Sequence, residues 1–264
     1  MGAPTAALVL AGRRGPDPLA AAEGVSHRAL VRVGGVPMLE RVIGALRASP
    51  WITEIAVSIE EPESLEPFPQ LAQWRDEGAI RVLPCAESPA RSAVAGLGQL
   101  GVDRALVAAA DLALLTAERV DGFLAAADAT AADLAVGVVE RAVVRNPTAG
   151  AARTWVQLRD GAFTGANLFA FRTSRAWRAA DFFVRAEAHR KKPWRWLGAL
   201  GPSLGVRYLA GALDLYTAFE SLSRRTQTRI APVRLREAEA ALDVDKHADL
   251  ALAERILAQE PPVL

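Results

Sequence analysis

The first half of the chain alternates short apolar runs with longer segments of helical period, and this alternation limits what the chain can fold into. Short runs of apolar residues are typical of strands buried on both faces of a sheet, and helical segments between them are typical of βαβ units. The pattern therefore predicts a mostly parallel sheet. The expected strands are Ala6–Leu10, Ile55–Ile59, Ile80–Leu83, Ala105–Ala109 and Leu134–Val139.

The segments between these runs carry helix signals. Proline suits the first turn of a helix, so the first helix is expected to start at Pro37. Its apolar face would consist of Met38, Leu39, Val42, Ile43 and Leu46. Ser88 and Thr116 are expected to cap two further helices, because their hydroxyls can accept from free amides of a first turn.

The pattern changes in the second half of the chain. Thr154–Leu158 and Asn167–Phe171 are expected to form antiparallel strands around a turn at residues 159–161, so the sheet becomes mixed. Residues 175–225 predict several helices, which would elaborate the fold. A last strand near Ile230–Val233 and a helix from about Ala248 to Leu257 would close a single α/β domain over residues 1–264.

Composition excludes several classes of protein. The 31 Lys and Arg residues nearly balance the 30 Asp and Glu residues, so a net charge of +1 gives no broad field for nucleic acid or an anionic membrane. The single Cys85 excludes an internal disulfide framework and the usual cysteine metal sites. No run approaches the roughly 20 apolar residues of a membrane span, and no signal peptide is recognisable. These features predict a soluble cytoplasmic protein.

The first strand leads into a loop with two glycines and two arginines, Gly12-Arg13-Arg14-Gly15. In open α/β sheets ligands bind at the carboxyl ends of the strands, where glycines expose backbone amides and arginines grip phosphates. The alternative is an ordinary turn. The spacing fits neither the dinucleotide-binding pattern nor the P-loop, which disfavours dehydrogenases and P-loop enzymes.

Carboxylates follow two other segments. Asp111 leaves an apolar strand at its carboxyl end, a suitable place for a Mg²⁺ ligand. Asp243 and Asp245 flank Val244, and strand alternation would point both toward one cation. The alternatives are a turn or cap residue for Asp111 and a solvated acidic turn for the later pair.

The strand and loop Leu8–Gly15, followed by His27–Leu39, resemble the start of the nucleotidyltransferases of the molybdenum cofactor guanylyltransferase type. The residues that match are Leu10, Ala11, Gly12, Gly15, Gly35 and Pro37. The resemblance implies a Rossmann-like, doubly wound fold of the nucleotide-diphospho-sugar transferase type. It also implies Mg²⁺-dependent transfer of a nucleoside monophosphate from an NTP to a phosphorylated small-molecule acceptor, with release of pyrophosphate.

Three positions depart from the family pattern. Arg13 replaces a glycine, Asp17 stands at the usual arginine, and Arg28 replaces a lysine. Because Arg and Lys hold phosphates with different geometry, the Arg28 exchange is not conservative.

The resemblance also implies roles for individual residues. It assigns catalysis to Arg14, Arg28 and Asp111; nucleotide binding to Leu10, Ala11, Gly12, Arg13, Gly15 and Ser92; acceptor binding to Gly165 and Asn167; and metal binding to Asp111, Asp245 and, in reserve, Asp243. Lys191 and Lys192, the only adjacent lysines, would meet an acceptor phosphate or lie on a solvated helix face. Residues 1–116 would form the nucleotide-binding half, 154–230 the acceptor side, and 231–264 the closing strand and helix.

The expected chemistry is an in-line attack by an acceptor phosphate on the α-phosphorus, without a covalent enzyme intermediate. Two other functions remain open. A non-catalytic nucleotide-binding or scaffold protein would explain the three departures, and a nucleotide-sugar glycosyltransferase would need an Asp-x-Asp where the chain has Asp111, Leu112 and Ala113. The aromatic residues between Trp177 and Trp196 would serve an acceptor pocket, a homodimer interface or the core.

Overall fold

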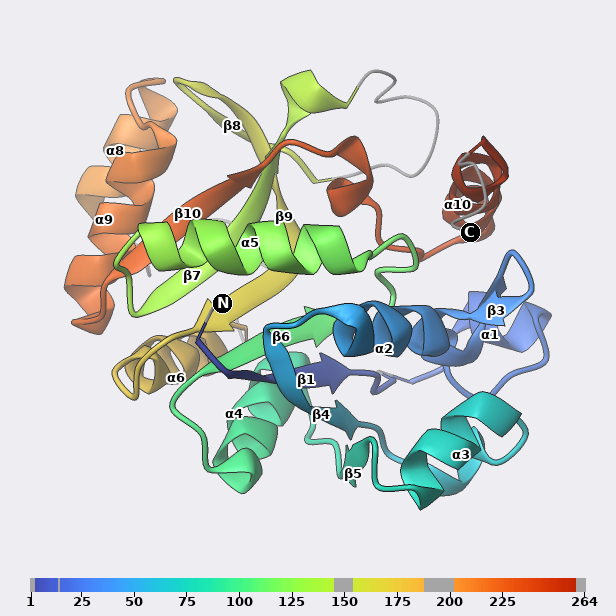
Figure 1. Cartoon of the computed structure of the whole chain (residues 1–264). Coiled ribbons are helices and arrows are strands. Elements are labelled where there is room, and N and C mark those ends of the chain that lie inside the picture. The colour runs from blue at the N-terminus through green and yellow to red at the C-terminus, as the bar shows by residue number, and fades with distance from the viewer. Residues whose placement is uncertain (1–2, 14, 145–153, 188–201, 260–264) are drawn as a thin grey trace.

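The computed structural model describes residues 3–13, 15–144, 154–187 and 202–259. They form an eight-stranded sheet of order β10-β7-β9-β6-β1-β4-β5, with β8 paired to β9, and a separate two-stranded hairpin of β2 and β3 (Figure 1). The strands are β1 (Thr5–Leu10), β2 (Arg32–Val33), β3 (Val36–Pro37), β4 (Ile52–Ser58), β5 (Arg81–Leu83), β6 (Ala105–Ala109), β7 (Leu134–Glu140), β8 (Val156–Leu158), β9 (Gly161–Phe171) and β10 (Ile230–Leu235).

The expected mixed, mostly parallel α/β fold is confirmed. Parallel pairs join β1 to β4 and β6, β4 to β5, and β7 to β10. Strand β9 runs antiparallel to its neighbours β6, β7 and β8. The carboxyl ends of β1, β4, β5 and β6 therefore meet at one edge of the sheet, where the sequence places its glycine loop and Asp111.

Helices cover both faces of the sheet, with α2 and α5 on one side and α4 and α6 on the other (Figure 1). Alternation along β1 explains this layering, because Val9 packs in the cluster that contains Leu39 while Leu8 packs with Leu97. The helices are α1 (Pro18–Ala22), α2 (Met38–Ala48), α3 (Pro69–Asp76), α4 (Pro89–Leu100), α5 (Ala117–Ala129), α6 (Ala176–Glu187), α8 (Pro202–Leu209), α9 (Leu215–Thr226) and α10 (His247–Gln259), with single 3₁₀ turns η1 (Arg28–Leu30), η2 (Pro62–Leu65), η3 (Arg141–Val143) and η4 (Ala238–Ala241).

The predicted helix signals act as expected. The Ser88 side chain accepts from the amide of Arg91 at the start of α4, and the Thr116 side chain does the same for Arg119 at the start of α5. Helix α2 begins one residue later than predicted, because Pro37 still pairs with Arg32 in the β2–β3 hairpin. Among the described residues no helix is both long and apolar enough to cross a membrane.

Strand β9 differs most from its predicted extent. It starts at Gly161, directly after the turn, rather than at Asn167. Its pairing with β7 is irregular, since Val136 pairs with Phe169 but Val138 pairs with Gly165, so three residues of β9 oppose Gly137.

The bulge depends on two residues. A Cβ on Gly137 would lie 3.3 Å from the Ala166 Cβ, so a glycine gives the bulged strand its room. Asn167 sits in the bulge at φ +52°, a left-handed conformation that asparagine tolerates better than most residues. A glycine within a strand pattern is the one sequence signal that points to such a bulge.

A buried carboxylate joins β7 to the ends of β9 and β10. The Asp133 side chain, 3% exposed, accepts from Thr173 Oγ1 at 2.8 Å and from the Arg229 amide at 2.9 Å. Burial raises the pKa of Asp133, but these hydrogen bonds and the Arg229 charge lower it more, so its pKa lies below the usual value of 3.8.

Replacing Asp133 by Asn should therefore lower the free energy of unfolding at neutral pH by about 1.5–3 kcal/mol, since hydrogen bonds to a charged group are lost. A lowered carboxyl pKa stabilises the fold above pH 3.8, and this contribution is lost as pH falls through the folded-state pKa. Urea unfolding at about pH 7 and at about pH 2 tests this. Replacement of the exposed Asp103 by Asn is the control. If the wild type still has the higher free energy of unfolding at the lower pH, the ionised Asp133 carboxylate is not the source of the stability.

Candidate active site

A cavity of about 820 Å³ lies at the carboxyl ends of β1, β4 and β6, beside β9. Most of the predicted site residues line it: Leu10, Ala11, Gly12, Arg13, Arg28, Ser92, Asp111, Asn167, Asp243 and Asp245. Gly15 and Gly165 are exposed and are not part of its wall. Arg14, Lys191 and Lys192 lie outside the described residues, so their roles stay predictions.

One backbone hydrogen bond brings the distant carboxylates together. The Val244 amide donates to the Asp111 carbonyl at 3.1 Å, although the two residues are far apart in the sequence. Val244 is fully buried, while its neighbours Asp243 and Asp245 both line the cavity. The predicted alternation is therefore confirmed, although residues 242–245 form an extended segment rather than a strand.

Asp111 lies in an electrostatically unfavourable place. Its Oδ1 atom is buried and accepts no hydrogen bond from the described residues. Burial is the largest cause that raises the pKa of Asp111, and the negative charges of Asp243 and Asp245 add to it, so the pKa reaches about 7. A cation bound at this oxygen would remove the penalty.

The donors suit Mg²⁺ in particular. Mg²⁺ binds one or two protein carboxylates and completes its shell with water and substrate phosphate oxygens. Within the described part of the chain no three His, Cys, Asp or Glu side chains are grouped to hold a metal by themselves. Asp111 and Asp245 supply two carboxylates of the kind that Mg²⁺ takes beside water and phosphate oxygens.

Arg28 bridges these carboxylates from η1. Its Nε donates to Asp17 Oδ2 at 2.6 Å, and its Nη1 donates to Asp245 and lies 4.0 Å from Asp111 Oδ2. Burial lowers the pKa of Arg28, but its three carboxylate neighbours raise it more, so it stays charged.

The Asp17 carboxylate has two roles. It caps α1 by accepting from the amides of Leu19 and Ala20, and it also pairs with Arg28. Burial raises the pKa of Asp17, but the cap hydrogen bonds and the ion pair with Arg28 lower it more. The pKa of Asp17 therefore lies below its usual value of 3.8. Asp17 and Arg28, two of the three positions that depart from the expected family pattern, therefore form an ion pair with each other.

The glycine loop is held by carboxylates that follow β4. The Arg13 amide donates to Glu60 Oε1 at 2.8 Å, and the Arg13 side chain pairs with Glu61 Oε1 at 2.5 Å. A Cβ on Gly12 would lie 2.6 Å from Cys85 Sγ, so only glycine fits at this position.

Glu60 also reaches the fully buried His27, whose Nε2 lies 3.2 Å from Glu60 Oε2. Sequence reasoning missed Glu60, which lines the cavity, and Cys85, which packs against Gly12. The signal was present, because each follows the carboxyl end of a parallel strand, as Gly12 and Asp111 do.

Two more predicted residues lie in the cavity wall. The Ser92 hydroxyl accepts from the Ala86 amide at 2.9 Å, so it already holds the loop between β5 and α4. Asn167 Nδ2 lies 3.5 Å from Asp243 Oδ2, which links the β9 bulge to the carboxylates. Lys246 also lines the cavity and was not predicted as a site residue.

The fold and this cavity define a nucleotidyltransferase-type domain, and comparison with known families agrees. The family model described as MobA-like NTP transferase domain matches residues 7–259, so the chain belongs to that family. A search of curated proteins found no match.

Solved structures give the same fold. A hypothetical transferase structure from Thermus thermophilus has 29% sequence identity and a TM-score of 0.76, and the match covers 94% of this chain and 99% of that one. A 4-diphosphocytidyl-2C-methyl-D-erythritol synthase from Anaerococcus prevotii has 12% identity and a TM-score of 0.59 over 97% and 99% of the two chains. A CMP:2-keto-3-deoxy-manno-octonic acid synthetase complexed with CTP has 14% identity and a TM-score of 0.56 over 97% and 100%.

The charge at Asp111 should cost stability when no ligand is bound. A carboxyl pKa raised from 3.8 to about 7 means that ionisation opposes folding above pH 3.8. Asp111→Asn is therefore expected to raise the free energy of unfolding at about pH 8 by roughly 0.5–2 kcal/mol, typical of relieved strain at a functional site. The gain should vanish at about pH 4.

Urea unfolding of the metal-free protein measures this effect, with Asp103→Asn as the control for removing one negative charge from an exposed position. A destabilised Asp111→Asn protein at the higher pH would show that Arg28 outweighs burial and the two neighbouring carboxylates.

Proposed function

We propose that this protein transfers a nucleoside monophosphate from an Mg²⁺-bound NTP to a phosphorylated small-molecule acceptor and releases pyrophosphate. The observation that carries the proposal is the hydrogen bond between Val244 and Asp111. It sets three carboxylates against the cavity that also contains the glycine loop at Gly12 and Arg13. A structural protein would gain nothing from three converging negative charges, which cost stability.

The carboxylates form the metal side of the cavity. Asp111 and Asp245 would hold Mg²⁺, and a bound Mg²⁺ would supply neutralisation of charge on the α-phosphate. Asp243 stays beside them, oriented by Asn167. The buried, unpaired Asp111 Oδ1 supports this assignment.

Arg28 forms the phosphate side. Its guanidinium reaches Asp245 and comes within 4.0 Å of Asp111, so phosphates bound at those carboxylates lie within its reach. The positive charge of Arg28 is therefore placed to attract the leaving pyrophosphate, together with the backbone of the loop at Gly12 and Arg13.

The reaction needs little beyond this arrangement. An acceptor phosphate is largely ionised at neutral pH, so its oxygen attacks the α-phosphorus without a protein base. The new bond forms between the acceptor oxygen and the α-phosphorus, opposite the bond from the α-phosphorus to the oxygen that bridges to the β-phosphate. That second bond breaks, and the β- and γ-phosphates leave as pyrophosphate. Catalysis then consists of positioning and electrostatic stabilisation by the residues named above.

A non-catalytic nucleotide-binding relative is the second candidate. The specific observation in its favour is that both Arg13 donors already have carboxylate partners. The Arg13 amide donates to Glu60, and the Arg13 side chain pairs with Glu61. Both donors belong to the loop that an NTP phosphate would contact. In an active enzyme the phosphates must displace these two carboxylates.

Thermal unfolding with CTP, GTP, ATP and UTP, each with and without Mg²⁺, separates the candidates. An NTP at about 100 times its Kd should raise the free energy of unfolding of the wild-type protein by roughly 2.7 kcal/mol. Asp111→Asn should remove the Mg²⁺-dependent part, because it removes a metal ligand. The control is Asp103→Asn, which is remote from the cavity lining and should respond like the wild type.

The stabilising NTP is then incubated with phosphorylated acceptors, and pyrophosphate release is measured. Stabilisation without turnover on any acceptor favours the non-catalytic relative. No stabilisation by any NTP contradicts both candidates, and a nucleotide sugar that stabilises instead would indicate a glycosyltransferase.

A further inference from the structure

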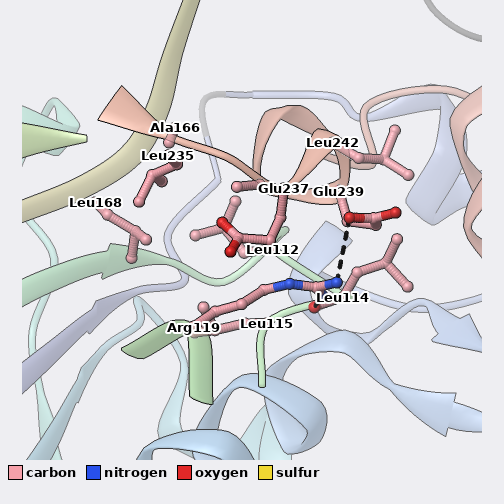
Figure 2. A pocket seen from close by; sticks show the side chains of 11 residues that line it. Leu112, Leu114, Leu115, Arg119, Ala166, Leu168, Leu235, Glu237, Glu239 and Leu242 are labelled. Carbon is pink, nitrogen blue, oxygen red and sulfur yellow. Dashed lines mark hydrogen bonds and ion pairs between the residues drawn. The ribbon is translucent and has the colours of Figure 1, made fainter. Parts of the chain in front are cut away.

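Arg119, near the start of α5, contacts both segments that carry the carboxylates. Its Nη1 donates to the carbonyl of Leu114, three residues beyond Asp111, and its Nη2 lies 3.3 Å from Glu239 Oε2. Glu239 belongs to η4, the turn that leads into Asp243. Figure 2 shows Arg119 reaching across to Glu239, with Leu114 and Leu242 nearby.

Arg119 is itself fixed in place. Its amide is capped by Thr116 Oγ1 at 3.4 Å, and its side chain is only 16% exposed. The cavity beside it measures about 10 Å³, which leaves room for at most one water molecule. That cavity is walled mainly by apolar side chains from both segments, namely Leu112, Leu114, Leu115, Leu235 and Leu242. A charged contact in such surroundings is stronger than one in water.

Arg119 does not line the large cavity, so it cannot touch the substrate there. It would act through the two segments that it joins. The Val244 amide and the Asp111 carbonyl connect those segments at one point, and Arg119 with Glu239 connects them at a second. The Arg119 ion pair therefore adds a second polar attachment between two segments that the buried cluster of Leu114, Leu242 and Val244 also joins.

We propose that Arg119, together with Glu239, is a positioning residue that sets Asp111 and the Asp243–Asp245 segment at the separation needed to bind a metal-bound NTP. The inference rests on the proposed function. Partners that hydrogen-bond directly to metal ligands change metal affinity or activity by roughly 10–100-fold when they are replaced. Arg119 acts one step further out, through the Leu114 carbonyl and Glu239 in the two segments that carry the ligands.

The simpler view is that this ion pair only stabilises the fold. The chain offers a control at the other end of α5, where Arg104 Nη2 lies 2.8 Å from Asp128 Oδ1, an oxygen that Arg172 Nε also contacts at 2.8 Å. Its side chains are 24% and 31% exposed, close to the 16% and 29% of Arg119 and Glu239. Neither Arg104 nor Asp128 lines the large cavity.

The test uses the full chain and measures the Mg²⁺ concentration that gives half-maximal binding of CTP, GTP, ATP or UTP by titration calorimetry. Arg119→Met, which keeps the aliphatic stem, should raise that concentration roughly 10-fold or more. Arg119→Lys should lie between Arg119→Met and the wild type, because one ammonium group cannot serve both acceptors equally well. Arg104→Met should lower the melting temperature and leave the Mg²⁺ dependence within about twofold of the wild type.

Glu239→Gln is the second variant, since it weakens the ion pair and leaves the bond from Arg119 to the Leu114 carbonyl. It should shift the Mg²⁺ dependence in the same direction even if Arg119→Met fails to fold. A Mg²⁺ dependence in Arg119→Met or Glu239→Gln no different from that in Arg104→Met overturns the positioning role and leaves the proposed function standing. Wild-type protein that binds no NTP with any Mg²⁺ dependence overturns both.

Discussion

The hydrogen bond from the Val244 amide to the Asp111 carbonyl is the interaction on which the site depends. It joins the end of a central strand to a segment near the end of the chain. The apolar residues around it, Leu114, Leu242 and Val244, fill one buried cluster and leave the carboxylates no direction except the cavity. The arrangement of charge thus follows from where the apolar residues are buried.

Charge balance accounts for the other features of the cavity. The charges of Asp243 and Asp245 act on Asp111, and Arg28 is the positive side chain that offsets them, while Arg13 and Lys246 line the same cavity. Arg28 replaces the family lysine and Asp17 replaces the family arginine, and the pairing of these two residues gives a physical reason for both exchanges. An arginine can bridge two carboxylates with separate nitrogens, which a lysine does less well.

The sequence predicts those parts of the fold that depend on local pattern. The runs at Ala6–Leu10 and Ala105–Ala109 are buried strands, and Ser88 and Thr116 cap helices, because apolar periodicity and capping act over a few residues. Strand β9 is longer than predicted because its first half mixes Thr and Gly with apolar residues, so no apolar run marks it.

Long-range contacts explain what the sequence alone could not show about the site. The strand-end rule brings Gly12 and Asp111 to one cavity, and alternation places Asp243 and Asp245 together, both as predicted. The contacts of Glu60 with the Arg13 amide and of Arg119 with Glu239 are different in kind. They join residues 47 and 120 positions apart, and only the packing of whole elements determines such pairs.

The antiparallel strand β9 divides the sheet into two parallel blocks. Strands β6, β1, β4 and β5 lie on one side of it, β7 and β10 lie on the other, and within the described residues β9 alone links them by strand pairing. Insertions or deletions around β7, β8 and β10 therefore leave the backbone pairing of the first block intact. Such a sheet allows one half of a binding site to diversify while the strands that support the other half keep their register.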